Sequence, residues 1–257
     1  MRYFLKLSYN GAPFHGWQSQ PNAVSVQQTV EEALAMVLRR PTPVTGAGRT
    51  DTGVNARVMY AHFDTDTPVE DSRRFLIGLN RLCGHDIALE QLIPVPDDAH
   101  ARFDATERSY KYFVTFLKSP FLDACSWHSP SPLDVEAMNK AAEILIDTDD
   151  FTSFAKLHSD AKTNICDVRK AEWSSWENTY GVPGIVFTIS ADRFLRNMVR
   201  AVVGTLVDVG RGKLSTDDFR KIIAEKNRCS AGTSMPPQAL FLWDIAYAGL
   251  GIGMNPD

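Results

Sequence analysis

The order of strand-like and helix-like segments narrows the folds open to this chain more than any other feature of its sequence. Residues 2–9 alternate apolar and polar side chains, which predicts a β-strand. Residues 25–39 instead carry apolar side chains at helical spacing, from Val26 to Val37. Further strands are predicted at 43–47, 57–63, 87–93, 108–116, 164–175, 184–190 and 240–247, and further helices at 134–146 and from residues 68, 193 and 215. Because strands and helices do not alternate strictly, an α+β class is expected.

Length and hydropathy limit the organisation of the chain. Its 257 residues, 44% of them hydrophobic, suffice for one large domain or two halves. The loop-like residues 94–104 predict a boundary between an N-terminal half, 1–104, and a C-terminal half, 105–257. No apolar run approaches the ~20 residues of a membrane span, and residues 1–10 do not read as a signal peptide. We therefore expect a soluble, cytoplasmic protein with no membrane partner.

The charge distribution leaves a nucleic-acid partner open. A net charge of −4 argues mildly against one, because nucleic-acid-binding proteins are usually basic. Residues 1–60, however, hold six lysines and arginines against three carboxylates. Since phosphates respond to a local patch rather than to the sum of charges, a basic face remains possible.

Residues 46–56 are the most informative segment. A phosphate-binding P-loop would require a lysine here, and a dinucleotide fingerprint would require glycine where Asp51 stands. The tripeptide Asp51-Thr52-Gly53 also occurs in aspartic proteases, but their two carboxylates share one proton, and no second copy exists in this chain. An ordinary polar turn, with Asp51 bonded to its own backbone and Gly53 at positive φ, stays open.

The stretch from Gly48 to Ala56 resembles the active-site motif of the TruA family of tRNA pseudouridine synthases. Further motifs of that family follow in register, and the resemblance extends from Tyr3 to Trp243. These motifs are Phe14-His15-Gly16-Trp17-Gln18, Ala101-Arg102-Phe103 with Arg108-Ser109-Tyr110-Lys111-Tyr112, Asp150-Phe151-Thr152-Ser153-Phe154, and Phe194-Leu195-Arg196-Asn197-Met198-Val199-Arg200. One departure is Asn55, which stands where the family usually has histidine.

The resemblance implies the pseudouridine synthase fold, in which two α/β halves with mixed, largely antiparallel sheets flank a central RNA-binding cleft. It implies a cofactor-independent isomerase that converts uridine to pseudouridine at positions 38, 39 and 40 of the tRNA anticodon stem-loop, and a homodimer. Asp51 would be the nucleophile, suited to trapping an oxocarbenium-like centre. Attack at C1′, attack at C6 and a glycal route all remain open. The alternative is a non-catalytic tRNA-binding or RNA-folding module on the same scaffold, and a hydrolase comes third.

Two further residues receive roles from the resemblance. Arg200 would be the ion-pair partner of Asp51, since a neighbouring cation keeps a desolvated carboxylate ionised; pairing with Asp208 or with helix-end carbonyls is the alternative. Tyr110 would stack on the extruded uracil, or else be an ordinary core aromatic.

The remaining expectations concern phosphate and metal binding. Arg49, Arg57 and Arg196 are candidates for phosphate contacts, with plain surface solvation as the alternative. No metal site is expected, because the six histidines form no group with ligand spacing.

Overall fold

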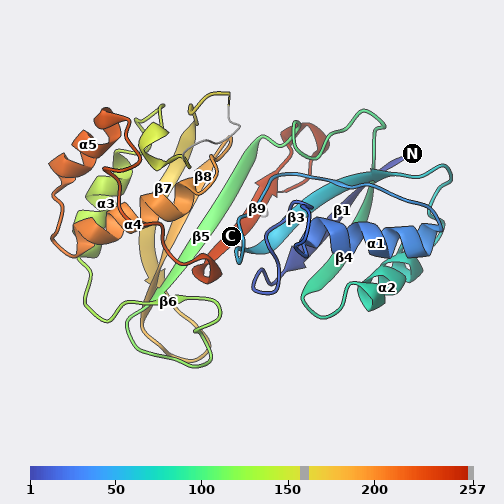
Figure 1. Cartoon of the computed structure of the whole chain (residues 1–257), viewed down its shortest axis with the longest axis horizontal. Coiled ribbons are helices and arrows are strands. Elements are labelled where there is room, and N and C mark those ends of the chain that lie inside the picture. Colours follow the sequence, from blue (N-terminus) through green and yellow to red (C-terminus); the bar gives the residue numbers. More distant parts are fainter. Residues whose placement is uncertain (157–161, 254–257) are drawn as a thin grey trace. The chain divides into compact units, whose positions relative to one another are not determined.

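The computed structural model describes residues 1–156 and 162–253, which form two compact units (Figure 1). Unit 1 comprises Met1–Thr106 together with the chain from Leu242 onward, and unit 2 comprises Glu107–Phe241. The expected halves were 1–104 and 105–257. The residues after Phe241 belong to unit 1 instead, because Tyr247 packs between Phe4 and Tyr60 and its hydroxyl donates to Ala101 O at 2.6 Å.

Unit 1 is an antiparallel sheet with two helices. Its strands follow the order β4-β1-β3-β9, and β2 pairs with β3. They are β1 (Arg2–Tyr9), β2 (Thr45–Gly46), β3 (Asn55–Asp64), β4 (Ile87–Val95) and β9 (Leu240–Ala246). Strand β1 lies between β3 and β4, so its Leu5 pairs in register with Ala61 of β3 and with Leu92 of β4.

The two helices of unit 1 begin at side-chain caps and contact each other (Figure 1). Helix α1 (Val26–Leu38) begins after Ser25, whose Oγ accepts from Gln28 N at 3.2 Å. Helix α2 (Ser72–Leu82) begins after Asp71, whose Oδ1 accepts from Arg74 N at 2.8 Å. The sequence placed the start of α2 at residue 68. The helix begins later because Asp71 supplies the acceptor that the free N–H groups of the first turn need.

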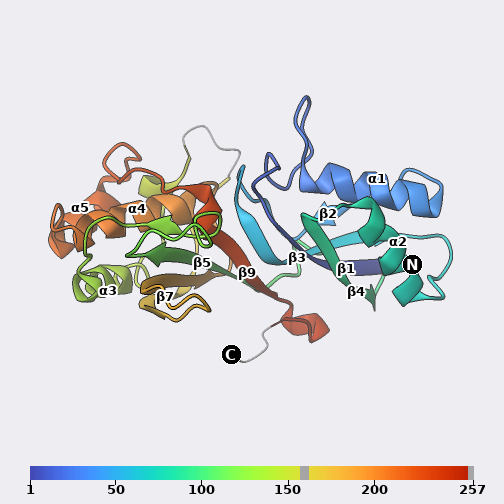
Figure 2. The ribbon, with the colours of Figure 1, turned by 90° about the horizontal axis from the view of Figure 1, so that it is seen from below.

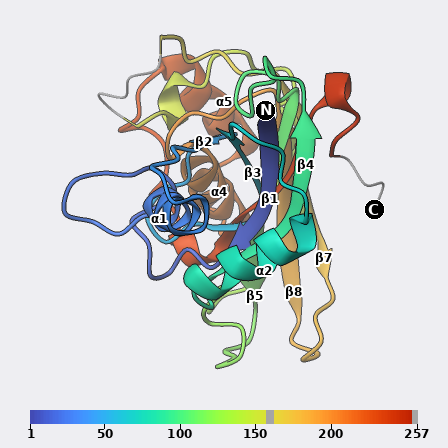
Figure 3. The ribbon, with the colours of Figure 1, turned by 90° about the vertical axis from the view of Figure 1, so that its right-hand side faces the viewer.

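Unit 2 combines mostly antiparallel strands with three helices. Its strands follow the order β5-β8-β7, with β6 parallel to β5. They are β5 (Glu107–Thr115), β6 (Trp127–His128), β7 (Val168–Trp176) and β8 (Gly184–Ala191), of which β7 and β8 lie side by side in Figure 3. The helices are α3 (Val135–Glu143), α4 (Met198–Gly210) and α5 (Thr216–Glu225); α3 contacts β7 and both other helices (Figure 2).

Helix α4 forms the centre of unit 2. All of its residues except Arg200 and Asp208 are buried. The sequence predicted that this helix starts at residue 193, which is wrong by five residues. Asn197 adopts a left-handed φ of 65°, a conformation that asparagine tolerates better than most residues. The helix therefore begins at Met198, and Arg196 precedes it rather than sharing its face with Arg200.

The expected α+β class is confirmed, with mainly antiparallel strand pairing. No helix in the described parts of the chain is long and apolar enough to cross a bilayer.

His62 couples the stability of unit 1 to pH. Its ring is buried on β3, and its Nδ1 accepts from Ala101 N at 3.1 Å. Burial, together with the nearby charge of Arg2, lowers the pKa of His62 to about 4. An unfolded histidine titrates near 6.5, so the unfolded chain binds more protons between these values. Stability is therefore complete above pH 6.5 and declines as pH falls toward 4.

We expect the free energy of unfolding to fall by about 2–3 kcal/mol between pH 7.5 and pH 4.5 through His62 alone. Urea unfolding of the wild type and of His62→Asn at both pH values measures this. The variant keeps an acceptor near the position of Nδ1 but has no imidazole to protonate, so its pH dependence should be weaker by that amount. Identical pH dependence in both proteins would contradict the expectation.

Candidate active site

Asp51 lies on the turn that connects β2 to β3 in unit 1. Its side chain is half-buried, and its neighbour Thr50 is buried. The turn is closed by main-chain groups: Val54 N donates to Asp51 O at 3.1 Å, and Gly53 adopts a φ of 76°. Gly53 is required at that φ because it has no Cβ. The hydrogen bond that closes the turn is therefore accepted by the main-chain carbonyl of Asp51.

The segment after β1 holds this turn from one side by direct backbone contact. A Cβ at Gly16 would lie 2.3 Å from Thr50 O, and a Cβ at Gly11 would lie 2.2 Å from Val54 O. Hydrogen bonds join the two segments, from Trp17 N to Thr50 O at 3.3 Å and from Gly53 N to Phe14 O at 3.3 Å. A side chain at either glycine would push the two backbones apart.

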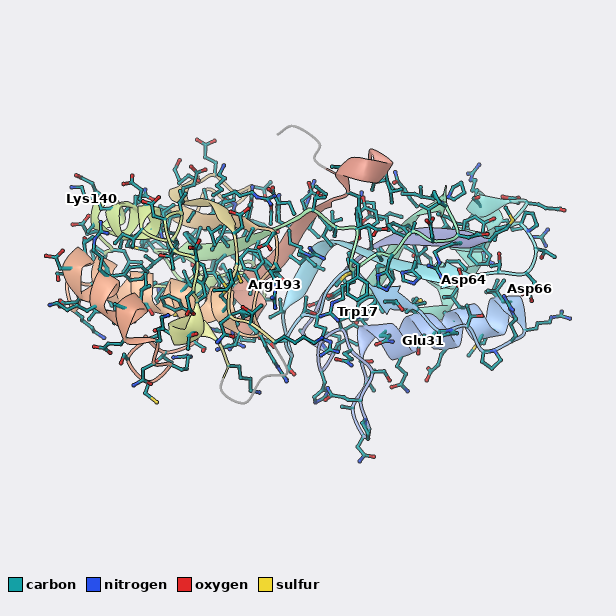
Figure 4. The ribbon with its side chains drawn as sticks, turned by 90° about the horizontal axis from the view of Figure 1, so that it is seen from above. Trp17, Glu31, Asp64, Asp66, Lys140 and Arg193 are labelled. Atoms are coloured by element: carbon teal, nitrogen blue, oxygen red, sulfur yellow. The ribbon has the colours of Figure 1, made fainter. Side chains whose placement is uncertain are left out.

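Two aromatic side chains complete the support of the turn. The Tyr9 hydroxyl lies 2.9 Å from Thr50 Oγ1 in a buried hydrogen bond. Trp17, labelled in Figure 4, is 3% exposed and covers Gly46, where a Cβ would lie 2.4 Å from the indole ring. Thr50 is therefore fixed on its main chain and on its side chain, immediately before Asp51.

Asn55 connects the Asp51 turn to the segment after β1 by a hydrogen bond. The side chain is 3% exposed, and its Oδ1 accepts from Gly11 N at 2.8 Å. The residue that departs from the family pattern thus joins the Asp51 turn to the segment after β1. The sequence indicated neither this bond nor the roles of Tyr9, Gly11, Gly16 and Trp17. The glycines at positions 11 and 16 were the one sequence feature that could have indicated a close backbone contact here.

Removing the Tyr9 hydroxyl tests whether this support sets the position of Asp51. If Asp51 is the nucleophile, as the resemblance implies, Tyr9→Phe should lower kcat roughly tenfold with KM unchanged, because small displacements of a reacting group cost rate rather than binding. Loss of the bond should cost about 1 kcal/mol of stability. Steady-state kinetics and urea unfolding measure both.

Tyr247→Phe is the matched control, since that hydroxyl donates to Ala101 O at 2.6 Å in the same unit and away from the turn. It should lose similar stability and keep kcat. An unchanged kcat in Tyr9→Phe would show that the hydroxyl does not position the carboxylate.

Arg49 and Arg57 are both exposed in unit 1. The guanidinium of Arg57 lies over the ring of Trp243, with Cζ 4.8 Å from the ring centroid, and its Nη1 donates to Trp243 O at 3.5 Å. Arg57 is thus held against β9 by a cation–π contact. The roles of both arginines in phosphate binding stay predictions.

Unit 2 carries the other candidates. Tyr110 on β5 is half-buried, and Phe194 meets its ring edge-on at a centroid distance of 5.1 Å. Tyr112 differs: it is fully buried, its hydroxyl donates to Pro236 O at 3.1 Å, and burial raises its pKa well above the ordinary value. Tyr110 is therefore the more accessible of the two. Arg196 is exposed.

Arg200 lies in the first turn of α4 and is held against the segment that follows α5. Its Nε donates to Met235 O at 2.5 Å, and Met235 N donates to Arg200 O at 3.1 Å. That segment lies close to the helix, because a Cβ at Gly204 would be 1.9 Å from Thr233 O. The carboxylate of Asp208 forms ion pairs with Arg211 and Lys213. A cation in a first helical turn opposes the helix dipole, so this position favours a nearby anion.

Metal ligands do not gather in either unit. Among residues 1–156 and 162–253, no three side chains of histidine, cysteine, aspartate or glutamate form a group that could hold an ion. Of the six histidines, His158 lies outside the described residues.

Comparison with known proteins places the chain in a family. A family model described as tRNA pseudouridine synthase matches residues 141–248. A protein of Parabacteroides distasonis named tRNA pseudouridine synthase A is 54% identical over 96% of both chains. The chain belongs to the tRNA pseudouridine synthase A family. Two further proteins of that name are also similar. The one from Bacteroides fragilis is 54% identical over 96% of both chains, and the one from Bacillus subtilis is 37% identical over 96% of this chain and 99% of the other. The resemblance seen in the sequence is confirmed, whereas the roles of individual residues in the tRNA pseudouridine synthase A family motif stay predictions.

Proposed function

We propose that this chain isomerises uridine to pseudouridine at positions 38, 39 and 40 of the tRNA anticodon stem-loop. Membership of the tRNA pseudouridine synthase A family over nearly the whole chain supports an isomerase that acts on tRNA. The observation that carries the proposal is the Asp51 turn, whose backbone is clamped between Gly11, Gly16 and Trp17. A clamped turn holds a carboxylate in one place, as nucleophilic catalysis requires.

The reaction rearranges bonds within one nucleotide. The bond from ribose C1′ to uracil N1 breaks, the base turns, and C1′ joins C5. C5 loses its proton and N1 gains one, so the composition of the RNA is unchanged and the overall reaction consumes no co-substrate. The carboxylate of Asp51 acts as the nucleophile; attack at C1′, attack at C6 and assistance of a glycal route all use it in the ionised form.

Arg200 and Tyr110 complete the proposed chemistry. Arg200 pairs with Asp51 and keeps its carboxylate charged while RNA excludes water from it. Support comes from the position of Arg200, half-buried in the first turn of α4, where the helix dipole favours an anion. Tyr110 stacks on the extruded uracil, supported by its half-exposed ring on β5.

Binding and assembly are the remaining parts of the proposal. Arg49, Arg57 and Arg196 contact tRNA phosphates, for which their exposure is the support. The protein acts in the cytoplasm, as an enzyme of tRNA processing would. It forms a homodimer, which would enlarge the basic surface that a chain of net charge −4 can offer. Sedimentation equilibrium tests the dimer, and a monomeric mass would remove that part.

Pseudouridine mapping of tRNA incubated with the purified protein tests the activity. Transcripts with uridine at position 38, 39 or 40 should gain pseudouridine there and remain unchanged elsewhere. Tight tRNA binding without product at any position would favour the non-catalytic RNA-binding module instead. Product only outside the anticodon stem-loop would retain the isomerase and remove the assigned positions.

A further inference from the structure

Three of the six exposed residues of α2 in unit 1 are arginines, and they gather on one side of the helix. At 100° per residue, Arg73, Arg74, Ile77 and Arg81 occupy one arc of the helix, and all four are exposed. Phe75 and Leu79 lie on the opposite side and are buried. We call these three arginines the α2 arginine face. From Ser72 to Leu82 the helix contains no carboxylate.

The charge of this face is not neutralised within the described residues. Arg73, Arg74 and Arg81 form no ion pair there, whereas Arg2, Lys6 and Arg40 of the same unit do. Glu70, exposed two residues before the helix, forms no ion pair with these arginines within the described residues, and other nearby carboxylates bond elsewhere. Asp71 caps the helix through Arg74 N, Glu31 and Glu32 of α1 accept from Gln27 and Gln28, and Glu90 of β4 pairs with Lys6.

Such a concentration of like charge needs a physical reason. Arg73 and Arg81 are two turns apart, about 12 Å along the helix, and like charges on one helix face destabilise it. The cost is offset when an anionic partner binds. A guanidinium presents a planar fork of donors that matches phosphate oxygens, and three of them in a row suit a chain of phosphates better than a single anion.

The exposed residues of α2 distinguish between three possible partners: a lipid surface, a protein and a nucleic acid. A helix that inserts into a lipid surface needs its apolar side free, but the apolar side of α2 is buried against unit 1. A protein partner would usually bury an apolar centre, and here Ile77 alone is apolar among the four exposed residues of the arc. A nucleic-acid backbone requires only the charges and their spacing.

We propose that the α2 arginine face binds the phosphate backbone of tRNA. This inference rests on the proposed function, and it assigns to α2 a contact with the body of the substrate rather than with the reacting uridine. The contact is independent of nucleotide sequence, because arginines on phosphates position an RNA without reading its bases. It contributes to affinity and to the salt dependence of binding.

The salt dependence of tRNA binding tests the proposal. The probe is a tRNA transcript with cytidine at positions 38–40, so that no uridine is converted there during the measurement. The triple variant Arg73→Gln, Arg74→Gln, Arg81→Gln should bind it about 10- to 100-fold more weakly than the wild type at 150 mM salt. The slope of log K against log salt should become shallower by about 2 to 3, since each phosphate contact contributes somewhat less than one.

Two further variants separate this contact from a general effect of charge. Arginine to lysine at the same three positions keeps the charge and should restore most of the slope. Lys140→Gln, Lys170→Gln and Lys221→Gln together remove the same charge from unit 2, where each lysine already pairs with a carboxylate. This control should bind like the wild type; Lys140 is labelled in Figure 4.

Wild-type affinity and slope in the triple glutamine variant would overturn the proposal. An equal loss in the unit 2 control would overturn it as well, because the effect would then follow net charge alone. Loss of binding to phosphatidylserine vesicles with unchanged tRNA binding would assign the face to a membrane. If the wild type modifies tRNA normally while the slope is unaffected by the variant, only this inference fails; if the wild type neither binds nor modifies tRNA, the proposed function fails.

Discussion

Replacing Asp51 with asparagine is expected to lower the rate of pseudouridine formation by at least roughly 10⁴-fold, because removal of a nucleophile eliminates the covalent route. Asparagine has nearly the same shape and cannot carry the negative charge. The turn itself is held by main-chain bonds and by Gly11, Gly16 and Trp17. The unfolding midpoint and the Kd for tRNA should therefore stay close to the wild-type values. Nucleoside analysis of the digested product measures the rate.

Asp66→Asn is the matched control for this substitution. Asp66 is an exposed carboxylate of unit 1 that pairs with Arg40 at 2.7 Å, and it is labelled in Figure 4. An exposed pair of this kind contributes little to stability, so the variant should keep full activity. Near-normal turnover in Asp51→Asn would remove the proposed nucleophile.

Arg200→Met is expected to lower kcat/KM by about 10²- to 10³-fold. Without the guanidinium, a carboxylate shielded from water takes up a proton at a higher pH than in the wild type. Activity of the variant should therefore rise with pH over a range in which the wild type is already at its plateau. The variant also loses the donor to Met235 O, so its unfolding free energy is measured alongside the pH–rate profile.

Arg200→Lys and Arg211→Met separate charge from packing. Lysine keeps the charge without the Nε bond, so Arg200→Lys should retain the wild-type shape of the pH profile. Arg211 follows the last turn of the same helix, near Asp208, and its guanidinium lies 5.4 Å from the centroid of the Trp127 ring. Arg211→Met should be active. A pH profile of Arg200→Met that parallels the wild type would refute the pairing of Arg200 with Asp51.

Local pattern predicted most elements of the fold and missed what depends on special backbone geometry. The alternation of residues 2–9 predicted β1 with its observed bounds, and the helices predicted from residues 25, 134 and 215 begin directly after the caps Ser25, Asp134 and Ser215. The start of α4 was misplaced because apolar spacing continues through residues 193–197, while Asn197 turns to a left-handed φ. Spacing records which side chains are apolar and carries no information on φ.

Long-range pairing was the second limit. The chain after Phe241 belongs to unit 1 because Tyr247 packs on Phe4 and Tyr60, residues far away in the sequence. For the site, motif order identified the Asp51 turn, yet the bond from Gly11 N to Asn55 and the contact of Gly16 with Thr50 join residues more than 30 positions apart. Neither contact produces a periodic pattern in the sequence, so only the structure shows how the turn is held in place.

Release of hydrogen from uracil C5 measures the central claim most directly. A tRNA transcript labelled with tritium at C5 of the uridines at positions 38–40 loses one tritium for every pseudouridine formed, because C5 becomes the atom bonded to ribose. Under single-turnover conditions the wild type should release it fully, and Asp51→Asn should release none while binding the same tRNA. Release by Asp51→Asn at the wild-type rate, or none by the wild type, would contradict the account.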